Sequence, residues 1–501
     1  MCVEVMAKRG KSSPTTYKAM SQDLNWSNYQ KRIFDWIENG SGHAIVDAKA
    51  GAGKTTTLVE AANRIDGSGL FVAFNKHIQR ELDDKLSDTE FICKTVHSCG
   101  YGALAYAGHD LTVEKEKYND IVDSFTEGVE FETHKKTAKA HLRRLASLVR
   151  LNLVNPDNLD GIARVANHHG IATEEVYHLV RPVIRKGTKL AKERGLIDFD
   201  DMIYLPVIWN LNFYRNDWVL VDEAQDLNTC EREVCSRMVK NDGRMIFVGD
   251  PRQAIYGFAG ADSDSFERIK EEFDCTELPL NITYRCPKSH VEHAQRLVPE
   301  IEAREDAPEG EIKEGSLSEL TDVVESGDYI LCRTNAPLIK NAIRLVKAGI
   351  QANVVGRNIK DRLLSIVDQV GFSNFIENLK DYHRKRADKA KENDAGGGKL
   401  EMLRDQFNCV QAVYEAFAPD TMGQLKAEIK DLFEDSEDAV KLMTVHKAKG
   451  LGNDRVIIIR PDLMPLEWRG QKDWQRKQEV NVQYISRSRS TDTLIYLSKN
   501  K

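Results

Sequence analysis

The chain has 501 residues, a formal net charge of -7 and 41% hydrophobic residues. This length allows two to four domains with large buried cores, and it excludes a single small binding module. The acidic balance excludes a protein that coats nucleic acid over its whole surface, but it leaves room for a local basic groove.

The cysteine pattern and the hydropathy exclude further classes of protein. Nine cysteines are scattered without a Cys-x-x-Cys pair, which argues against a zinc site or a disulfide framework. No run approaches the roughly 18 to 20 apolar residues of a membrane span, and the N-terminus lacks the apolar core of a secretory signal. We therefore expect no membrane partner and a cytoplasmic location in a bacterium or phage-infected cell, or a nuclear one in a eukaryote.

The first half of the chain alternates short apolar runs with helical patterns. Residues 1–22 are polar and aperiodic, which predicts a mobile tail. The runs that follow are HAIVDA, GLFVAFN, FICKTV, DWVLVDEA and RMIFVGD. Buried strands that alternate with helices are typical of a parallel sheet covered on both faces. We expect a first domain over residues 23–275, with a charged helical insertion at about 110–210.

A second series of the same kind follows. Its candidate strands are DYILCRT, IQANVVG, VKLMTVH, DRVIIIR and TLIYLS. A charged helical stretch at about 375–435 interrupts the series, and its three consecutive glycines suggest a flexible joint. The sequence therefore predicts an α/β protein whose second parallel-sheet domain covers residues 276–501.

A glycine-rich loop follows the first apolar run. Residues 48–55 read AKAGAGKT and lead into a helical pattern. In a phosphate-binding loop, backbone N–H groups cradle phosphates, the lysine (Lys54) reaches the β and γ groups, and the threonine (Thr55) binds Mg²⁺. Ala48 stands where that pattern has its first glycine. We expect nucleotide contacts from Ala50, Gly51, Ala52, Gly53, Lys54, Thr55 and Thr56.

Two adjacent acids end the apolar run WVLVDEAQD. At the carboxyl edge of a parallel sheet, Asp222 can hold Mg²⁺ through water while Glu223 takes a proton from an attacking water. An Asp-Glu pair alone usually marks a strand that enters a loop. Together with the glycine loop, the pair predicts a nucleotide hydrolase.

A third motif, GDPRQAIYGFAGA, covers residues 249–261. The amide of Gln253 beside a γ-phosphate can sense the state of the nucleotide. Tyr256 and Phe258 are suitable platforms on which bases stack.

In order and spacing, these motifs resemble those of the UvrD/Rep-like helicases of superfamily 1, from about Leu24 to Leu497. The resemblance implies two RecA-like motor domains with helical insertions, with ATP and Mg²⁺ as cofactors. It implies single-stranded DNA and single-strand/duplex junctions as partners, with replication or recombination proteins as further candidates. The motif sequences also resemble those of the F-box helicase branch, and the short phage and bacterial members match equally well.

The resemblance assigns roles to further residues of the first domain. Gln30, upstream of the glycine loop, looks like the glutamine that reads adenine; on its own it is a solvated residue. The segments FNK and TVHS match DNA-contact motifs, although Phe74 and His97 are otherwise core or surface residues. The DNA contacts expected in this domain are Phe74, Asn75, Thr95, His97, Tyr256 and Phe258.

In the second domain, NITYR and QYISRSRS match the motifs that carry arginine fingers. By that alignment Arg285 and Arg489 reach the γ-phosphate across the cleft. Arg487 is the rival of Arg489, which is favoured because it follows Ser488 at the family's Thr-Arg position. The segment MTVHKAKGL matches a motif that couples DNA to nucleotide, and it supplies candidates for phosphate or sugar contacts: Thr444, His446 and Lys447.

Three departures from the family pattern bear on this assignment. Lys49 replaces a usual glycine, Ala259 replaces an arginine that contacts DNA in many members, and Gly452 replaces a glutamate that contacts the ribose. None removes the metal ligands, the base or either finger. We therefore expect hydrolysis to survive, whereas the departures leave ribose selectivity and part of the strand grip open.

Other charged residues receive no catalytic role. Asp200 and Asp201 are interpreted as solvated acids. The basic clusters at residues 134–150 and 380–391 are candidates for contacts with duplex DNA, against the alternative of solvated helical faces.

The sequence predicts an ATP-dependent DNA helicase or translocase that moves on single-stranded DNA, and the wording HKAKGL favours the 3′-to-5′ direction. A translocase that clears proteins from DNA shares every motif. An RNA helicase is the alternative in a different substrate class.

Overall fold

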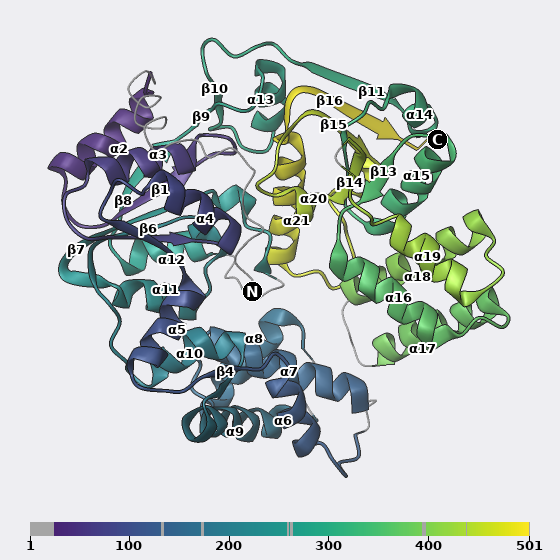
Figure 1. The fold of residues 1–501 in the computed structure, drawn as a ribbon, viewed down its shortest axis with the longest axis horizontal. Coiled ribbons are helices and arrows are strands. Elements are labelled where there is room, and N and C mark those ends of the chain that lie inside the picture. The colour runs from purple at the N-terminus through teal and green to yellow at the C-terminus, as the bar shows by residue number, and fades with distance from the viewer. Residues whose placement is uncertain are drawn as a thin grey trace, which may run out of the picture.

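Two parallel six-stranded sheets, each covered by helices, form the centre of the protein (Figure 1). The structure is a computed structural model that describes residues 25–131, 135–171, 175–257, 260, 264–392, 397–436 and 438–499. The expected tail at residues 1–22 lies outside this part of the chain. The predicted α/β class with two parallel-sheet domains is confirmed.

The first sheet has the strand order β3-β2-β6-β7-β1-β8, and all its pairs are parallel. Five of its strands are the apolar runs seen in the sequence. The sixth begins after residue 275 and pairs with β1, so the first sheet extends past the expected boundary. The strands are β1 (Ala44–Ala48), β2 (Gly69–Ala73), β3 (Phe91–Thr95), β6 (Asn216–Val221), β7 (Val239–Gly249) and β8 (Thr276–Leu280).

Alternating side chains along these strands pack into two separate hydrophobic cores. Ile45 and Val72 face one hydrophobic cluster, whereas Val46 and Phe71 face the other. Successive side chains of a strand point to opposite faces, so each run is buried on both sides. The covering helices are α2 (Asn28–Asn39), α3 (Lys54–Arg64), α4 (Lys76–Lys85), α5 (Val96–Tyr106), α10 (Phe199–Ile208), α11 (Thr229–Arg237) and α12 (Ser265–Glu272).

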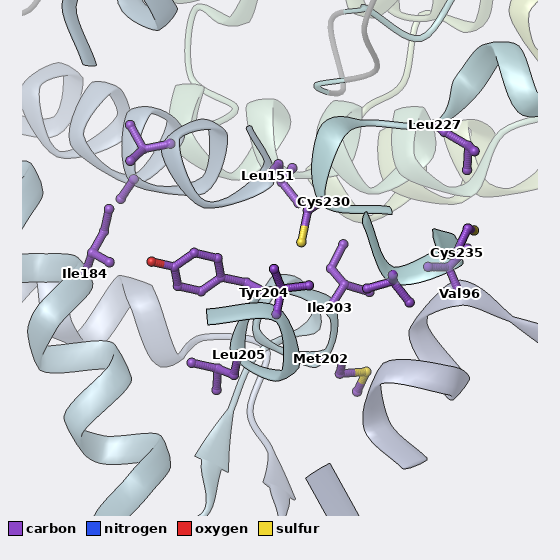
Figure 2. Packing of buried hydrophobic residues seen from close by; sticks show 14 of the residues in the cluster. Val96, Leu151, Ile184, Met202, Ile203, Tyr204, Leu205, Leu227, Cys230 and Cys235 are labelled. Carbon is purple, nitrogen blue, oxygen red and sulfur yellow. The ribbon is translucent and has the colours of Figure 1, made fainter. Parts of the chain in front are cut away.

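A helical layer, formed by part of the chain between β3 and β6, extends the first domain (Figure 1). Two short strands, β4 (Thr112–Val113) and β5 (Leu196–Ile197), pair in parallel at its base. Leu151 and Ile184 of this layer share one buried cluster with Tyr204 of α10 and Cys230 of α11 (Figure 2). The insertion is therefore fused to the core of the sheet. Its helices are α6 (Lys117–Phe125), α7 (Lys135–Leu151), α8 (Leu159–His169) and α9 (Tyr177–Arg194).

A buried ion cluster fixes this layer to α10, and it corrects the interpretation of Asp200 and Asp201 as solvated acids. Asp201 is fully buried and Asp200 is only partly exposed. The guanidinium of Arg150, itself 1% exposed, donates to Asp198 at 2.8 Å, to Asp201 at 2.7 Å and to Asp200 at 3.0 Å. Lys117 also pairs with Asp201. Arg150 is thus committed to structure, although it belongs to one of the two basic clusters.

The second sheet has the order β11-β16-β15-β12-β14-β13 and is also parallel throughout. Five of its strands are the expected runs; β11, a mostly polar edge strand, gave no apolar signal. The strands are β11 (Glu311–Ser316), β12 (Tyr329–Cys332), β13 (Ala352–Val354), β14 (Val440–Thr444), β15 (Asn453–Ile459) and β16 (Ser490–Ser498).

Helices cover the second sheet and form a second layer at its far end (Figure 1). A small parallel pair, β9 (Ile282–Thr283) and β10 (Glu302–Ala303), lies between the two sheets in the chain. The sheet helices are α13 (Lys288–Gln295), α14 (Leu320–Val323), α15 (Asn335–Lys347), α20 (Val445–Ala448) and α21 (Asp473–Arg487). The layer consists of α16 (Arg357–Val370), α17 (Phe375–Glu392), α18 (Gly397–Phe417) and α19 (Met422–Asp431).

Among the described residues, the helices are too short or too polar to cross a bilayer.

Replacing Arg150 with methionine tests the buried cluster. The change leaves three carboxylates without their shared cation, so the free energy of unfolding should fall by about 3–5 kcal/mol. Arg185→Met on α9 removes an exposed arginine that pairs with Asp157, and it should cost about 1 kcal/mol or less. Urea unfolding of both variants measures the difference, and equal losses would contradict the structural role of Arg150.

Candidate functional site

The glycine loop lies between β1 and α3 at the carboxyl edge of the first sheet. Gly51 and Gly53 have φ values of 74° and 77°, a left-handed conformation that favours glycine. Lys49 is 3% exposed and its ammonium group turns back to Asp47 at 2.7 Å. The lysine that replaces a usual glycine is therefore paired with an acid of β1. Thr55 and the exposed Thr56 follow in the first turn of α3.

Lys54 and Glu223 form an ion pair across the edge of the sheet. The Nζ of Lys54 lies 2.7 Å from the Oε1 of Glu223. Burial alone would lower the pKa of Lys54, but the charges of Glu223 and Asp222 raise it to about 12. Burial alone would raise the pKa of Glu223, but Lys54 and then Lys449 lower it to about 2. The glycine-loop lysine and the expected base therefore neutralise each other in this structure.

Asp222 behaves differently from its neighbour. Burial and then the charge of Glu223 raise the pKa of Asp222 to about 6. Its Oδ1 accepts a hydrogen bond from the backbone N–H of Glu223 at 2.8 Å. Glu223 itself has a φ of 53°, a strained conformation that directs its carboxylate toward Lys54.

A chain of amides connects the acid pair to Gln253. Gln225 donates to the Oε2 of Glu223 at 2.5 Å and accepts from the backbone N–H of Asp250 at 2.9 Å. Gln253 then donates to the Oδ2 of Asp250 at 2.6 Å. Gln225 and Asp250 received no role from the sequence, although both lie inside the motifs that identified their neighbours. Their adjacency follows from the neighbouring positions of β6, β7 and β1 in the sheet.

The second domain contacts the glycine loop directly. The backbone N–H of Ala50 donates to the hydroxyl of Tyr484 at 2.9 Å, and the N–H of Tyr284 donates to the carbonyl of Gly51 at 2.8 Å. A Cβ atom at Gly51 would lie 2.6 Å from both the Oγ1 of Thr283 and the Cβ of Arg285. The expected finger Arg285 is thus seated against the loop.

Arg489 is buried beside Arg285, and this placement separates it from its rival. Arg489 is 1% exposed, and its Nη2 reaches the Oε1 of Gln253 at 3.4 Å. Burial and then the charge of Arg285 lower the pKa of Arg489 to about 9. Arg487 instead donates to the carbonyl of His293, away from Gln253. Gly452 packs here too, since a Cβ atom at that residue would lie 3.2 Å from the Nε of Arg285.

Both the nitrogen and the oxygen of the Gln30 side-chain amide make hydrogen bonds. It is 3% exposed, its Nε2 donates to the Oγ1 of Thr57 at 3.0 Å, and its Oε1 accepts from the hydroxyl of Tyr284 at 2.9 Å. Its Oε1 also accepts from the backbone N–H of Ser27, which closes the capping box of α2. The interpretation of a lone solvated glutamine is therefore wrong.

An aromatic pair lies at the junction of the two domains. Phe74 is 47% exposed and stacks on Tyr256, with ring centroids 6.1 Å apart and an interplanar angle of 14°. The ammonium group of Lys449 lies 4.8 Å from the centre of the Tyr256 ring and 2.5 Å from Asp226. Sequence reasoning missed Lys449, although it lies within the HKAKGL motif. Phe258 and Ala259 lie outside the described residues.

The segment before Tyr256 is anchored in the second domain. Ile255 is 1% exposed and belongs to the hydrophobic cluster of Met443 and Val482. Asn481 donates to the carbonyl of Ala254 at 2.9 Å. A movement of the second domain must therefore act on the segment that carries both Gln253 and Tyr256.

Three expected DNA contacts of the first domain lie at helix starts. The Oδ1 of Asn75 accepts from the backbone N–H of Ile78 in α4, and the Oγ1 of Thr95 accepts from Ser98 in α5. These side chains satisfy backbone donors at helix N-termini. Burial lowers the pKa of His97, and the charge of Asp198 opposes this shift only partly.

The expected contacts of the second domain surround the short helix α20. Thr444 is its N-cap residue and Lys447 is exposed. Burial, followed by the charges of Arg333 and Lys449, lowers the pKa of His446 to about 3. His446 is therefore neutral at physiological pH and can contact a strand only as a neutral hydrogen-bonding group.

Known proteins are similar to this chain in sequence. Residues 29–274 match the family described as the UvrD/REP helicase N-terminal domain. The F-box DNA helicase protein 1 of Schizosaccharomyces pombe is 24% identical in an alignment 525 positions long, which covers 93% of this chain and 56% of that protein.

Bacterial proteins match over shorter stretches. The ATP-dependent DNA helicase Rep of Escherichia coli is 25% identical over 285 residues, 50% of this chain and 40% of Rep. DNA helicase IV of Escherichia coli is 23% identical over 340 residues, 58% of this chain and 50% of that protein. The chain thus spans about half the length of these curated relatives.

Substitution of Gly51 tests the contact between the glycine loop and the second domain. Gly51→Ala adds both left-handed strain and a clash with Thr283 and Arg285, whereas Gly42→Ala adds only strain, since no atom lies within 4 Å of its Cβ position. We expect the free energy of unfolding to fall by about 1–2 kcal/mol for Gly42→Ala. The decrease for Gly51→Ala should exceed it by about 1–3 kcal/mol. Urea unfolding measures both decreases. Equal values would show that Thr283 and Arg285 move aside for the added methyl group at little cost.

Proposed function

Because this chain belongs to the UvrD/Rep-like helicase family, we propose that it hydrolyses ATP in the cleft between its two sheet domains and uses the energy to move along single-stranded DNA. The observation that carries the proposal is that cations from both domains meet at one edge of the first sheet: Lys54 in the glycine loop, Arg285 against Gly51, and Arg489 beside Gln253. The pKa of Arg489 is lowered first by its burial and then by the charge of Arg285. The negative charge of a triphosphate bound between the domains would neutralise these cationic groups.

Thr55 and Asp222 are the residues that would hold Mg²⁺. They fit, because the Asp222 carboxylate is buried and has a pKa of about 6, so that a nearby cation stabilises its charged form. The ion supplies charge neutralisation on the β- and γ-phosphates when it is bound.

The ion pair of Lys54 and Glu223 provides a way to switch the basicity of the Glu223 carboxylate. In this structure Lys54 holds the pKa of Glu223 near 2, where a carboxylate is a poor proton acceptor. When the phosphates take Lys54 as their partner, Glu223 loses its nearest cation and burial raises its pKa. Binding of the substrate thus prepares the carboxylate to accept a proton from the attacking water.

The contacts of Tyr256 suggest how the strand and the nucleotide communicate. Bases that stack on Phe74 and Tyr256 displace or reorient the ring beneath Lys449. Lys449 holds Asp226 and also lowers the pKa of Glu223. A cycle of closure on ATP and opening after phosphate release then shifts the grip on the strand. The motif wording HKAKGL supports movement from 3′ to 5′, and translocation assays on strands tailed at either end decide the direction.

Two other functions share most of this chemistry. A translocase that strips proteins from DNA differs only in its product, and unwinding and filament-clearing assays run side by side distinguish the two. An RNA helicase differs in the polymer that stimulates its ATPase activity. Single-strand/duplex junctions and replication or recombination proteins are the partners we propose to test. We propose that the protein is located in the cell compartment that contains the DNA.

The decisive experiment is steady-state ATPase with and without single-stranded DNA, for the native chain and for Glu223→Gln. The glutamine cannot accept a proton, so the DNA-stimulated rate should fall by about 10²- to 10⁴-fold. Fluorescent ATP binding should be retained, because Lys54 and both arginines remain. A native rate that does not respond to DNA, or that responds only to RNA, would refute the DNA motor.

A matched pair of substitutions tests the assignment of the second arginine finger. Arg489→Lys removes the planar group that reaches Gln253, and the maximal ATPase rate should fall by about 10³-fold. Arg487→Lys changes a residue that contacts the carbonyl of His293, and the rate should stay within a few-fold of the native one. The reverse order of rates would transfer the role to Arg487.

A further inference from the structure

Gln225 lies at the centre of the hydrogen-bonded chain that joins the acid pair to the second domain. The glutamine is 1% exposed and belongs to η1 (Ala224–Asp226), the single turn that follows Glu223. One end of its amide contacts Glu223, the base of the proposed reaction, and the other end contacts Asp250. The motifs of the sequence gave Gln225 no role, but these contacts point to one.

Only one orientation of the Gln225 amide satisfies its surroundings. Its Nε2 donates to the Oε2 of Glu223 at 2.5 Å and lies 3.5 Å from the Oδ2 of Asp226. Its Oε1 accepts from the backbone N–H of Asp250 at 2.9 Å. In the reversed orientation, the amide oxygen would face two carboxylates and the NH₂ group would face another donor. The hydrogen-bond network therefore fixes which end of the amide faces Glu223.

The two oxygens of the Glu223 carboxylate have different partners. Oε1 pairs with the ammonium group of Lys54 at 2.7 Å, whereas Oε2 is held by Gln225. A phosphate group that takes Lys54 as its partner frees Oε1 and leaves Oε2 bound. Because the amide of Gln225 is neutral, it holds the carboxylate in place without cancelling its charge.

The same glutamine ties the carboxylate to the segment that carries Gln253. Asp250, whose backbone donates to Gln225, accepts from the side chain of Gln253 at 2.6 Å. The Oε1 of Gln253 in turn accepts from Arg489 at 3.4 Å. Gly249 leaves the space for this arrangement, since a Cβ atom there would overlap the Oε1 of Gln225. A continuous chain of contacts thus runs from the acid pair to a buried arginine of the second domain.

We propose that Gln225 is a positioning residue, which holds the Oε2 of Glu223 and thereby directs Oε1 to the attacking water. In the hydrolysis step, the oxygen of this water bonds to the γ-phosphorus, the bond from phosphorus to the leaving oxygen of ADP breaks, and the water proton passes to Oε1. The inference rests on the proposed function, because it requires Glu223 to be the base. Gln225 acts only through Glu223.

The test disturbs Gln225 in two independent ways. Gln225→Met keeps the approximate size of the side chain and removes both hydrogen bonds. Gly249→Ala leaves the glutamine in the chain but displaces its Oε1. Gln406→Met is the matched control, because Gln406 is a buried glutamine, 5% exposed, in α18 of the second helical layer. Each change is made in the native chain and in Glu223→Gln.

In the native chain, both Gln225→Met and Gly249→Ala should lower the DNA-stimulated kcat by about 10- to 10²-fold, because a small displacement of a catalytic group is costly. The KM for ATP and the binding of fluorescent ATP should stay close to their native values, since Lys54 is intact. In Glu223→Gln, the same two changes should lower kcat no further, because residues that act as a unit are not additive. Gln406→Met should leave kcat unchanged in both chains.

An equal loss of kcat in the native and Glu223→Gln chains would show that Gln225 acts elsewhere, and it would overturn the inference. A native kcat in Gln225→Met, or a loss that appears only as a raised KM, would also overturn it. Urea unfolding of each variant establishes that the assayed protein is folded. Gly249→Ala carries the test if Gln225→Met does not fold.

The rate of Glu223→Gln alone separates this inference from the proposed function. If Glu223→Gln abolishes the DNA-stimulated rate and Gln225→Met does not affect it, the motor stands and only the positioning role is lost. If Glu223→Gln does not lower the rate, the assignment of the base and the positioning role fail together.

Discussion

The carboxyl edge of the first parallel sheet is the constraint on which the rest of the site depends. Because β6, β7 and β1 are neighbours and run in the same direction, the segments that follow them emerge side by side. The glycine loop, the acid pair and Gln253 are therefore collected at one edge, as is usual for ligand sites in open α/β sheets. The ion pair of Lys54 and Glu223 and the amide chain through Gln225 follow from this placement.

The second domain completes the site with cations and contributes no acid to it among the contacts described. Tyr484 and Tyr284 bind the backbone of the glycine loop, and Arg285 and Arg489 lie behind them. Among the described contacts, the buried Arg489 binds carbonyl, amide and hydroxyl oxygens and no carboxylate, and such a buried charge is costly without an anionic ligand.

The chain itself ties the two domains to one another. Ile255 belongs to the first domain in sequence but packs in the core of the second, between Gln253 and Tyr256. A packed connection of this kind would transmit a change at the proposed nucleotide site to the aromatic pair, because packed cores shift between discrete arrangements and do not deform continuously. Lys449 and Asp226 form a second connection by charge.

The sequence by itself determined the two-sheet α/β class, because buried parallel strands are continuous apolar runs, and it located Lys54, Asp222, Glu223 and Gln253 by motif. It missed β11, which is a polar edge strand, and the membership of β8 in the first sheet, because strand order is not encoded locally. It took Asp201 for a solvated acid, since the Arg150 that buries it is 51 residues away. Only the tertiary structure placed Arg489 beside Gln253 and Arg487 at His293, introduced Lys449 and joined two basic clusters into one cavity. These outcomes depend on contacts between residues distant in the chain, and the pattern of near neighbours carries no information about them.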